Sequence, residues 1–166
     1  FTSDLRPPLL EELGLTRTIE ILGSRTAREE GIEIEVRIVG EPRPLPPELE
    51  LGLYRLAQEA LSNVRRHAGA THVDLSLTYG EEAVKLEIAD NGVGFEIPSD
   101  PAELVHLGRL GLVGMQERAR LFGGRAVIRS QPGEGATITV LIPFATTALR
   151  ALDTANNRAA QTPPTP

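Results

Sequence analysis

Residues 47–68 read PELELGLYRLAQEALSNVRRHA, which is the longest helical pattern in the chain. Its apolar residues recur at intervals of three and four, as the stripe of a packed helix requires. The stripe consists of Leu53, Ala57, Ala60, Leu61, Val64 and Ala68. Pro46-Pro47 suits the first helical turn, where the N–H that proline lacks would have no partner. The stretch therefore predicts a long helix with one buried face.

The flank of this helix away from the stripe carries polar side chains that could bind a ligand or take part in catalysis. At about 100° per residue, Glu59, Asn63 and Arg66 fall within one narrow sector, and His67 sits at its edge. Carboxylate and carboxamide oxygens suit Mg²⁺, and a guanidinium or imidazole can meet phosphate oxygens. A solvated helix face is the alternative. Asparagine weakens that alternative because it is a poor helix former in mid-helix.

Strands and further helices are predicted on both sides of the long helix. Alternation of apolar and polar residues predicts strands over 32–39, 72–79, 83–90, 125–130 and 136–142. Residues 16–30 and 115–122 read as shorter helices ended by glycine, and residues 91–113 as a mobile loop. This order predicts an α+β fold. The expected fold has two layers: a mixed sheet of about five strands, and three main helices packed on one face of that sheet.

Composition excludes several classes of function. The 166 residues contain 17 Lys and Arg against 23 Asp and Glu, for a net charge of −6, which argues against nucleic acid as a partner. There is no cysteine, so a disulfide framework, a thiol nucleophile and cysteine-ligated zinc are excluded. No apolar run reaches the roughly 20 residues that span a bilayer. The chain begins Phe-Thr-Ser, which suggests a piece of a longer protein.

Three domains or segments are expected along the chain. Residues 1–14 read as an irregular lead-in because they contain Pro7-Pro8, and residues 15–143 as the folded domain. Residues 144–166 are rich in Ala, Thr and Asn and end in a proline cluster, which is typical of a disordered tail or linker.

Asp90-Asn91-Gly92-Val93-Gly94-Phe95 directly follows a predicted strand. Its glycines permit positive φ and a close approach of the backbone to a ligand. Asp90 ends an apolar strand, and a half-buried carboxylate needs a donor, such as the exocyclic amine of a purine. An ordinary turn is the alternative. A dinucleotide-binding loop fits less well, because its glycines should open a helix at once.

Two further glycine motifs complete the set. Gly108-Arg109-Leu110-Gly111-Leu112-Val113-Gly114-Met115 leads into a helix, whose free N–H groups can bind an anion. A flexible linker with a helix cap is the alternative. Gly133-Glu134-Gly135-Ala136-Thr137 reads as a hairpin turn in front of a strand, and a plain tight turn explains it equally.

In order and spacing, these four elements resemble the ATP-binding catalytic domain of sensor histidine kinases. That domain has the Bergerat fold shared with DNA gyrase B, Hsp90 and the mismatch-repair protein MutL. Residues 58–68 match the N box of the family, 90–95 and 111–115 its glycine boxes, and 133–137 its last box. The family usually has Gly-Thr together in the last box, whereas Ala136 here separates Gly135 from Thr137.

The resemblance implies a site for ATP and Mg²⁺. Asp90 would bind the adenine amine with help from Thr137 and a water, Asn63 would hold Mg²⁺ with Glu59 beside it, and residues 95–110 would form a mobile ATP lid. Glu59 and Asn63 would be the catalytic residues. The implied ATP-binding residues are Asn63, Arg66, His67, Asp90, Gly92, Gly94, Phe95, Gly111, Leu112, Gly114, Met115 and Thr137.

The resemblance also suggests a subclass and its partners. Gly114-Met115-Gln116-Glu117-Arg118-Ala119 is similar to the pattern of kinases that pair with NarL/LuxR-type response regulators, and so is Asp4-Leu5-Arg6-Pro7-Pro8. The implied activity is a protein histidine kinase, cytoplasmic in itself or as the cytoplasmic part of a membrane-bound sensor. It would be a homodimer only at full length.

The phosphoacceptor of such a kinase is not evident in this chain. His67 belongs to the N box, His72 lies on a predicted strand and His106 lies in the predicted loop. The acceptor is therefore expected on a separate dimerisation domain, without which this chain should not autophosphorylate. Two alternatives stay open: an anti-sigma-factor serine kinase of the same fold, and a non-enzymatic ATP-binding interaction domain.

Overall fold

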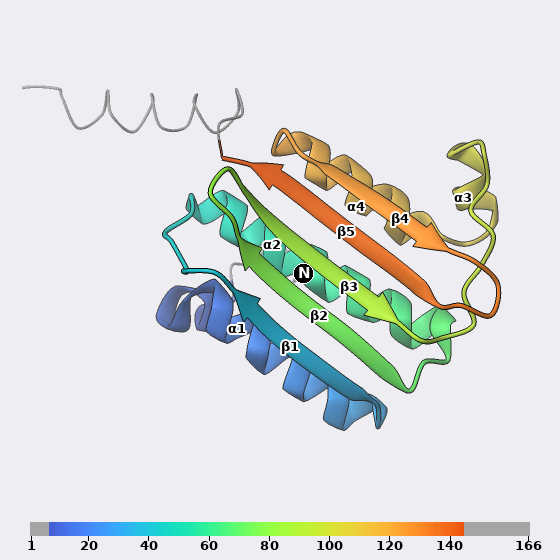
Figure 1. Cartoon of the computed structure of the whole chain (residues 1–166), viewed down its shortest axis with the longest axis horizontal. Helices are drawn as coiled ribbons and strands as arrows, with labels where there is room; N and C mark the ends of the chain where they lie inside the picture. The colour runs from blue at the N-terminus through green and yellow to red at the C-terminus, as the bar shows by residue number, and fades with distance from the viewer. Residues whose placement is uncertain (1–6, 145–166) are drawn as a thin grey trace, which may run out of the picture.

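A five-stranded mixed sheet forms one layer of the protein. The computed structural model describes residues 7–144. The strands are β1 (Glu33–Val39), β2 (His72–Tyr79), β3 (Ala83–Asp90), β4 (Arg125–Ser130) and β5 (Ala136–Pro143). They lie in the order β1-β2-β3-β5-β4, with β1 and β2 parallel and all other neighbours antiparallel (Figure 1). The predicted mixed sheet is confirmed.

The helices form the second layer. They are α1 (Pro8–Glu30), α2 (Pro47–Asn63) with its π-helical extension η2 (Val64–Ala68), α3 (Ala102–His106) and α4 (Leu110–Leu121). Figure 1 shows α1, α2 and α4 on the same face of the sheet. The predicted two-layer α+β architecture is therefore confirmed. Between residues 7 and 144, no helix has the length and apolar character needed to cross a membrane.

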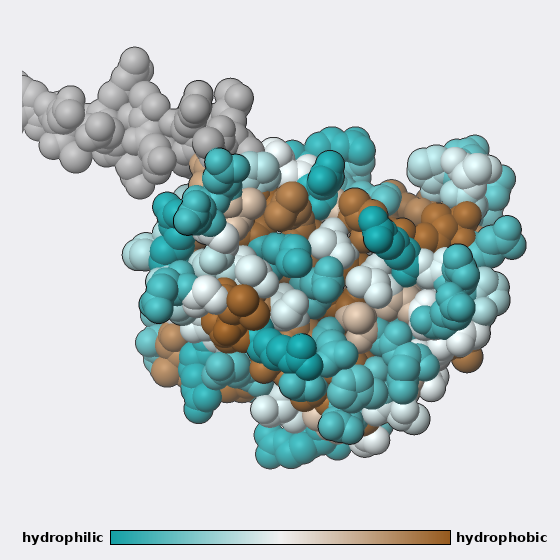
Figure 2. All heavy atoms as spheres, in the orientation of Figure 1, coloured by the Kyte–Doolittle hydropathy of each residue, from teal (hydrophilic) through white to brown (hydrophobic). Residues whose placement is uncertain are grey.

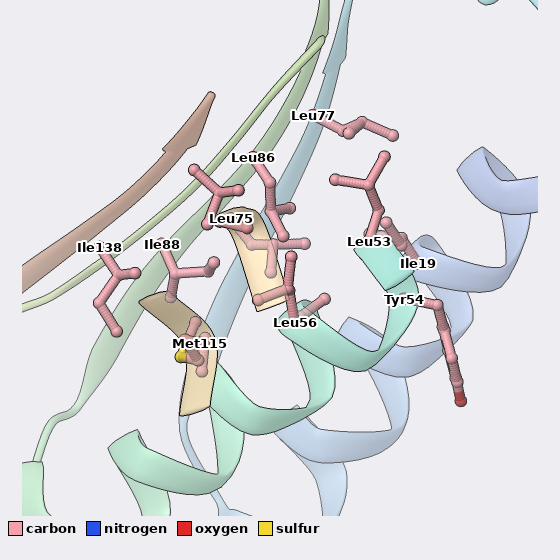
Figure 3. Close-up of a cluster of buried hydrophobic side chains, with 14 of the residues drawn as sticks. Ile19, Leu53, Tyr54, Leu56, Leu75, Leu77, Leu86, Ile88, Met115 and Ile138 are labelled. Carbon is pink, nitrogen blue, oxygen red and sulfur yellow. The ribbon is translucent and has the colours of Figure 1, made fainter. Parts of the chain in front are cut away.

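The core lies between the two layers. Every second residue of β2 and β3 points toward the helices, so Leu75, Leu86 and Ile88 are at most 2% exposed. They meet Leu53 and Leu56 of α2, which are fully buried (Figure 3). Buried and exposed residues alternate strictly because one face of each strand packs against the helices and the other faces solvent. This is why the bounds predicted for these two strands agree with the structure.

The expected irregular lead-in is wrong for residues 8–13, which are helical. Pro8 begins α1, and Leu10 is only 2% exposed in the core. Gly14, at φ 78°, interrupts the helical backbone, and the hydroxyl of Thr18 lies 2.7 Å from its carbonyl oxygen. The prolines thus start the helix rather than prevent it. Residues 1–6 and the predicted tail from 145 onward lie outside the described residues.

The predicted loop over 91–113 is also corrected. It contains α3, and α4 begins at Leu110 rather than at Met115. Leu112, Met115 and Ala119 are buried at helical spacing, so packing against the core extends the helix through two glycines. Mobility of the lid over 95–110 stays a prediction.

The long helix becomes π-helical where Arg66 and His67 lie. After Asn63, α2 continues as one π-helical turn and ends at Gly69, which is left-handed at φ 58°. Such single π turns occur frequently at functional sites because they redirect side chains without ending the helix. The even spacing of 100° per residue, assumed from the sequence, therefore does not hold for Arg66 and His67.

The other face of the sheet is open and mostly polar (Figure 2). On β1 and β2, one ligand atom each from Glu35, His72 and Asp74 lies within 4.8 Å of the others. Arg37 also reaches this cluster, with Nε 2.9 Å from Glu35 Oε1 and a second nitrogen 3.6 Å from Asp74 Oδ1. The cluster is therefore a network of ion pairs in which basic side chains offset the negative charges of Glu35 and Asp74.

His72→Gln is expected to remove part of the pH dependence of stability. Its contact with Asp74 raises the pKa of His72 above the ordinary value of about 6.5. The charged imidazole should therefore stabilise the fold fully below about pH 6.5, and this contribution should vanish as the pH rises through the folded-state pKa.

Urea denaturation of wild type and His72→Gln across this pH range checks the expectation. The difference in free energy of unfolding should be largest at low pH and should shrink toward high pH. A difference that does not change with pH would contradict the assignment. Comparison at each pH cancels the opposite contribution of His67, whose pKa is lowered.

Candidate nucleotide site

A cavity opens where the end of α2, the end of β3 and the start of α4 meet. Six residues singled out from the sequence line it: Asn63, His67, Asp90, Gly94, Phe95 and Leu112. Ile88 and Ile138 form part of its wall, and both project from the sheet toward the helix layer (Figure 3). Apolar walls with a few polar groups are typical of a small-molecule site.

Asp90 supplies a fixed hydrogen-bond acceptor in this cavity. It is the last residue of β3 and is partly buried, beside Ala136 of β5. The backbone N–H of Gly92 donates to its Oδ1 at 2.9 Å, which holds the carboxylate in place. A carboxylate fixed beside apolar walls suits a ligand with a flat apolar ring and an amino group.

Gly94 lets two loops approach each other at the rim of the cavity. Its φ is +63°, and a Cβ there would collide with the backbone oxygen of Gln131 and lie 2.8 Å from that of Gly135. Nearby, the N–H of Phe95 donates to Ser130 Oγ at 2.9 Å. The first glycine motif is therefore joined to the turn that the last motif forms, and both shape the cavity.

A second, more polar cavity adjoins the first. Its lining includes Glu59, Arg66, Gly111, Gly114 and Met115, all singled out from the sequence. Arg66 donates to Glu59 Oε1 at 2.9 Å, so the carboxylate is held by a neighbouring cation. The first turn of α4 forms one wall, where a helix start favours negative charge.

Asn63 lies between the two cavities. Its side chain is 7% exposed, and its Nδ2 lies 3.9 Å from Met115 Sδ, a lining residue of the second cavity. Among residues 7–144, its Oδ1 has no hydrogen-bond partner. A Cβ added at Gly111 would lie 3.3 Å from this oxygen and would collide with Glu59. The glycine therefore keeps space open beside both oxygen atoms.

Arg109 and His67 are the two basic side chains that line the first cavity. The Arg109 guanidinium lies 4.1 Å from the centre of the Phe95 ring, a cation–π contact. Burial lowers the pKa of His67, and the charges of Arg109 and Arg66 lower it further. The lowered pKa favours the neutral form of His67, which can form hydrogen bonds rather than ion pairs.

Two predicted residues do not line either cavity. Gly92 acts through its N–H, which positions Asp90. Thr137 lies on the open face of the sheet, in a groove with Lys85 and Arg129, so the expected contact with a base is corrected. Ala136 lines the cavity in its place. A shift of one residue along a strand moves a side chain to the opposite face.

Several lining residues carried no functional signal in the sequence. Ile88 was recognisable only as an inward residue two positions before Asp90, and Ile138 only as part of an alternating strand. Arg109 and Arg118 stand inside sequence motifs, but no local pattern indicates a role for either. Their place at the cavities follows from how α4 packs on α2.

Comparison with known proteins agrees with this geometry. The family described as "Histidine kinase-, DNA gyrase B-, and HSP90-like ATPase" matches residues 48–146. The histidine-protein kinase/phosphatase DegS of Brevibacillus brevis is 37% identical over 86% of this chain and 36% of its own. The sensor histidine kinase MctS of Rhizobium johnstonii is 39% identical over 84% of this chain and 30% of its own.

A third relative and a solved structure extend the comparison. The oxygen sensor histidine kinase NreB of Staphylococcus carnosus is 34% identical over 85% of this chain and 40% of its own. The chain thus spans between 30% and 40% of the length of these three relatives. The histidine kinase domain of the Erythrobacter litoralis blue-light activated kinase shares the fold, with a TM-score of 0.62 and 21% identity over 83% of this chain and 64% of its own. With its matched sequence, its mixed sheet and its paired cavities, this chain belongs to the family of histidine kinase-, DNA gyrase B- and HSP90-like ATPases, whose fold binds ATP.

Proposed function

We propose that this chain is the ATP- and Mg²⁺-binding catalytic domain of a two-component sensor histidine kinase. It transfers the γ-phosphoryl group of ATP to a histidine on a separate dimerisation domain. The observation that carries the proposal is the pair of adjoining cavities, one with Asp90 among apolar walls and one with Glu59 and Arg66. Their chemistry matches a purine base and a chain of phosphates, respectively.

The base is held by Asp90, which accepts a hydrogen bond from the exocyclic amine of adenine. Ile88 and Ile138 pack against the ring and exclude water from this hydrogen bond. The phosphates then extend past Asn63 into the second cavity, where Arg66 and the start of α4 offset their charge. Transfer depends on this positioning and charge neutralisation more than on covalent chemistry from the protein.

The residues present fit a magnesium ion. The partner-free Oδ1 of Asn63 and the carboxylate of Glu59 are hard oxygen donors on one helix flank, and both face the space beside Gly111. When bound there with nucleotide, Mg²⁺ would offset charge on the phosphate oxygens. Arg66 holds Glu59 by an ion pair, so it also sets where that carboxylate points.

The partners of the reaction follow from this role. The phosphoryl acceptor is a histidine on the dimerisation domain of the same full-length protein, which is a homodimer. The phosphoryl group then passes to a response regulator, of the NarL/LuxR type on the basis of the Gly114–Ala119 sequence. The domain works in the cytoplasm, where ATP and the regulator are available.

A transfer assay tests the proposed function. The chain is mixed with that dimerisation domain, Mg²⁺ and ATP labelled in the γ-phosphate, and label is expected on the acceptor histidine. Asn63→Ala should lower the rate at least about tenfold, because the ligand oxygen is lost. Thermal unfolding of the variant controls for damage to the fold. ATP binding without any transfer to histidine would contradict the kinase assignment.

A further inference from the structure

Arg118 lies on the face of α4 that borders the second cavity. Gly111, Gly114 and Arg118 recur at intervals of three and four residues, so they share one side of the helix. That side meets α2, because a Cβ at Gly111 would collide with Glu59. Glu59, Arg66 and Arg118 accordingly line the same cavity.

The charges around this cavity do not cancel. Glu59 and Arg66 form an ion pair at 2.9 Å. Within residues 7–144, Arg118 forms no hydrogen bond or ion pair, whereas Arg120 of the same helix donates to Glu117 at 3.0 Å. One positive charge therefore faces the cavity without a counter-ion. The start of α4, which also favours an anion, lines the same cavity.

The position of Arg118 sets which part of a nucleotide it can reach. The base cavity and the second cavity meet at Asn63, whose amide lies against Met115. Arg118 lies almost one turn beyond Met115, further along α4 from the base cavity. It therefore lies at the far end of the phosphate path, beyond Asn63.

We propose that Arg118 binds the terminal phosphate of ATP and so makes the site prefer ATP over ADP. This inference rests on the proposed function and adds a residue that discriminates by the γ-phosphate. Arg66 remains the partner of Glu59, and Arg118 supplies the uncompensated charge. ADP, which ends one phosphate earlier, does not reach it.

Calorimetric titration of the chain with ADP and with a non-hydrolysable ATP analogue, both with Mg²⁺, tests this role. Arg118→Ala should weaken binding of the ATP analogue about tenfold, the size of one charge-assisted hydrogen bond, and leave ADP binding unchanged. Arg120→Ala is the matched control, because it removes an exposed arginine from the opposite side of α4 and should change neither affinity.

The outcomes separate this inference from the proposed function. If wild type binds neither nucleotide, the proposed function fails and the inference fails with it. If wild type binds both, but Arg118→Ala leaves the preference for the ATP analogue unchanged, only the inference fails. Equal weakening of both nucleotides by Arg118→Ala also overturns it, because the effect would not depend on the terminal phosphate.

Discussion

Asp90→Asn is expected to weaken ATP binding by about 100-fold while leaving the melting temperature close to that of wild type. The amide has the same shape, and its oxygen can still accept the hydrogen bond from Gly92. What is lost is the charged acceptor for the adenine amine, a charge-assisted bond worth roughly 2–3 kcal/mol. Calorimetric titration with ATP and Mg²⁺ measures the change.

Glu87→Gln is the matched control for that prediction. Glu87 lies on the same strand but on the open face of the sheet, where its carboxylate accepts a hydrogen bond from Thr139 at 2.9 Å. Its substitution removes one negative charge at a similar place in the chain and should not change ATP affinity. Equal losses in the two variants would mean that overall charge, not the acceptor in the cavity, governs binding.

Gly94→Ala should destabilise the domain by about 3 kcal/mol or more. The positive φ of +63° is strained for alanine, at roughly 1–2 kcal/mol, and the new Cβ would collide with the backbone oxygen of Gln131. Backbone cannot move aside as a side-chain end can. The loops that shape the base cavity should therefore separate, and nucleotide binding should be lost together with stability.

Gly133→Ala separates the two causes in this prediction. Gly133 also has a positive φ, of +83°, but nothing lies within 4 Å of a Cβ there. This variant should show only the backbone strain, about 1 kcal/mol, and should keep the cavity. Thermal unfolding followed by circular dichroism compares the variants. If Gly94→Ala were as stable as Gly133→Ala, the close approach of the two loops would be refuted.

Local sequence predicted those elements whose burial repeats regularly. The strands at 72–79 and 83–90 have the predicted bounds, because one face of each is packed and the other is wet. The sequence does not predict the start of α4, because the two glycines in its first turns resemble a linker. Gly111 is in fact helical, and its missing side chain leaves room for the carboxylate of Glu59. The start of α4 therefore depends on tertiary packing rather than on the helix propensity of its residues.

In the candidate site, too, some residues can be predicted from local sequence and others depend on tertiary packing. Asp90, Asn63 and Glu59 stood out because polar residues at such positions need a partner, and all three line the cavities. The expected position of Thr137 is wrong because Ala136 separates it from Gly135, and this one-residue shift puts it on the other face of the sheet. Arg118 gave no local signal, because its role depends on a helix contact between residues distant in sequence.

Titration of the wild-type chain with Mg²⁺-ATP and with Mg²⁺-GTP tests the central claim most directly. Asp90 accepts hydrogen bonds only, so it favours the amine of adenine and repels the oxygen that guanine carries at the same ring position. We expect one ATP bound per chain and binding of GTP that is weaker by at least about 100-fold. Equal affinities, or no heat with either nucleotide, would contradict an adenine site at Asp90.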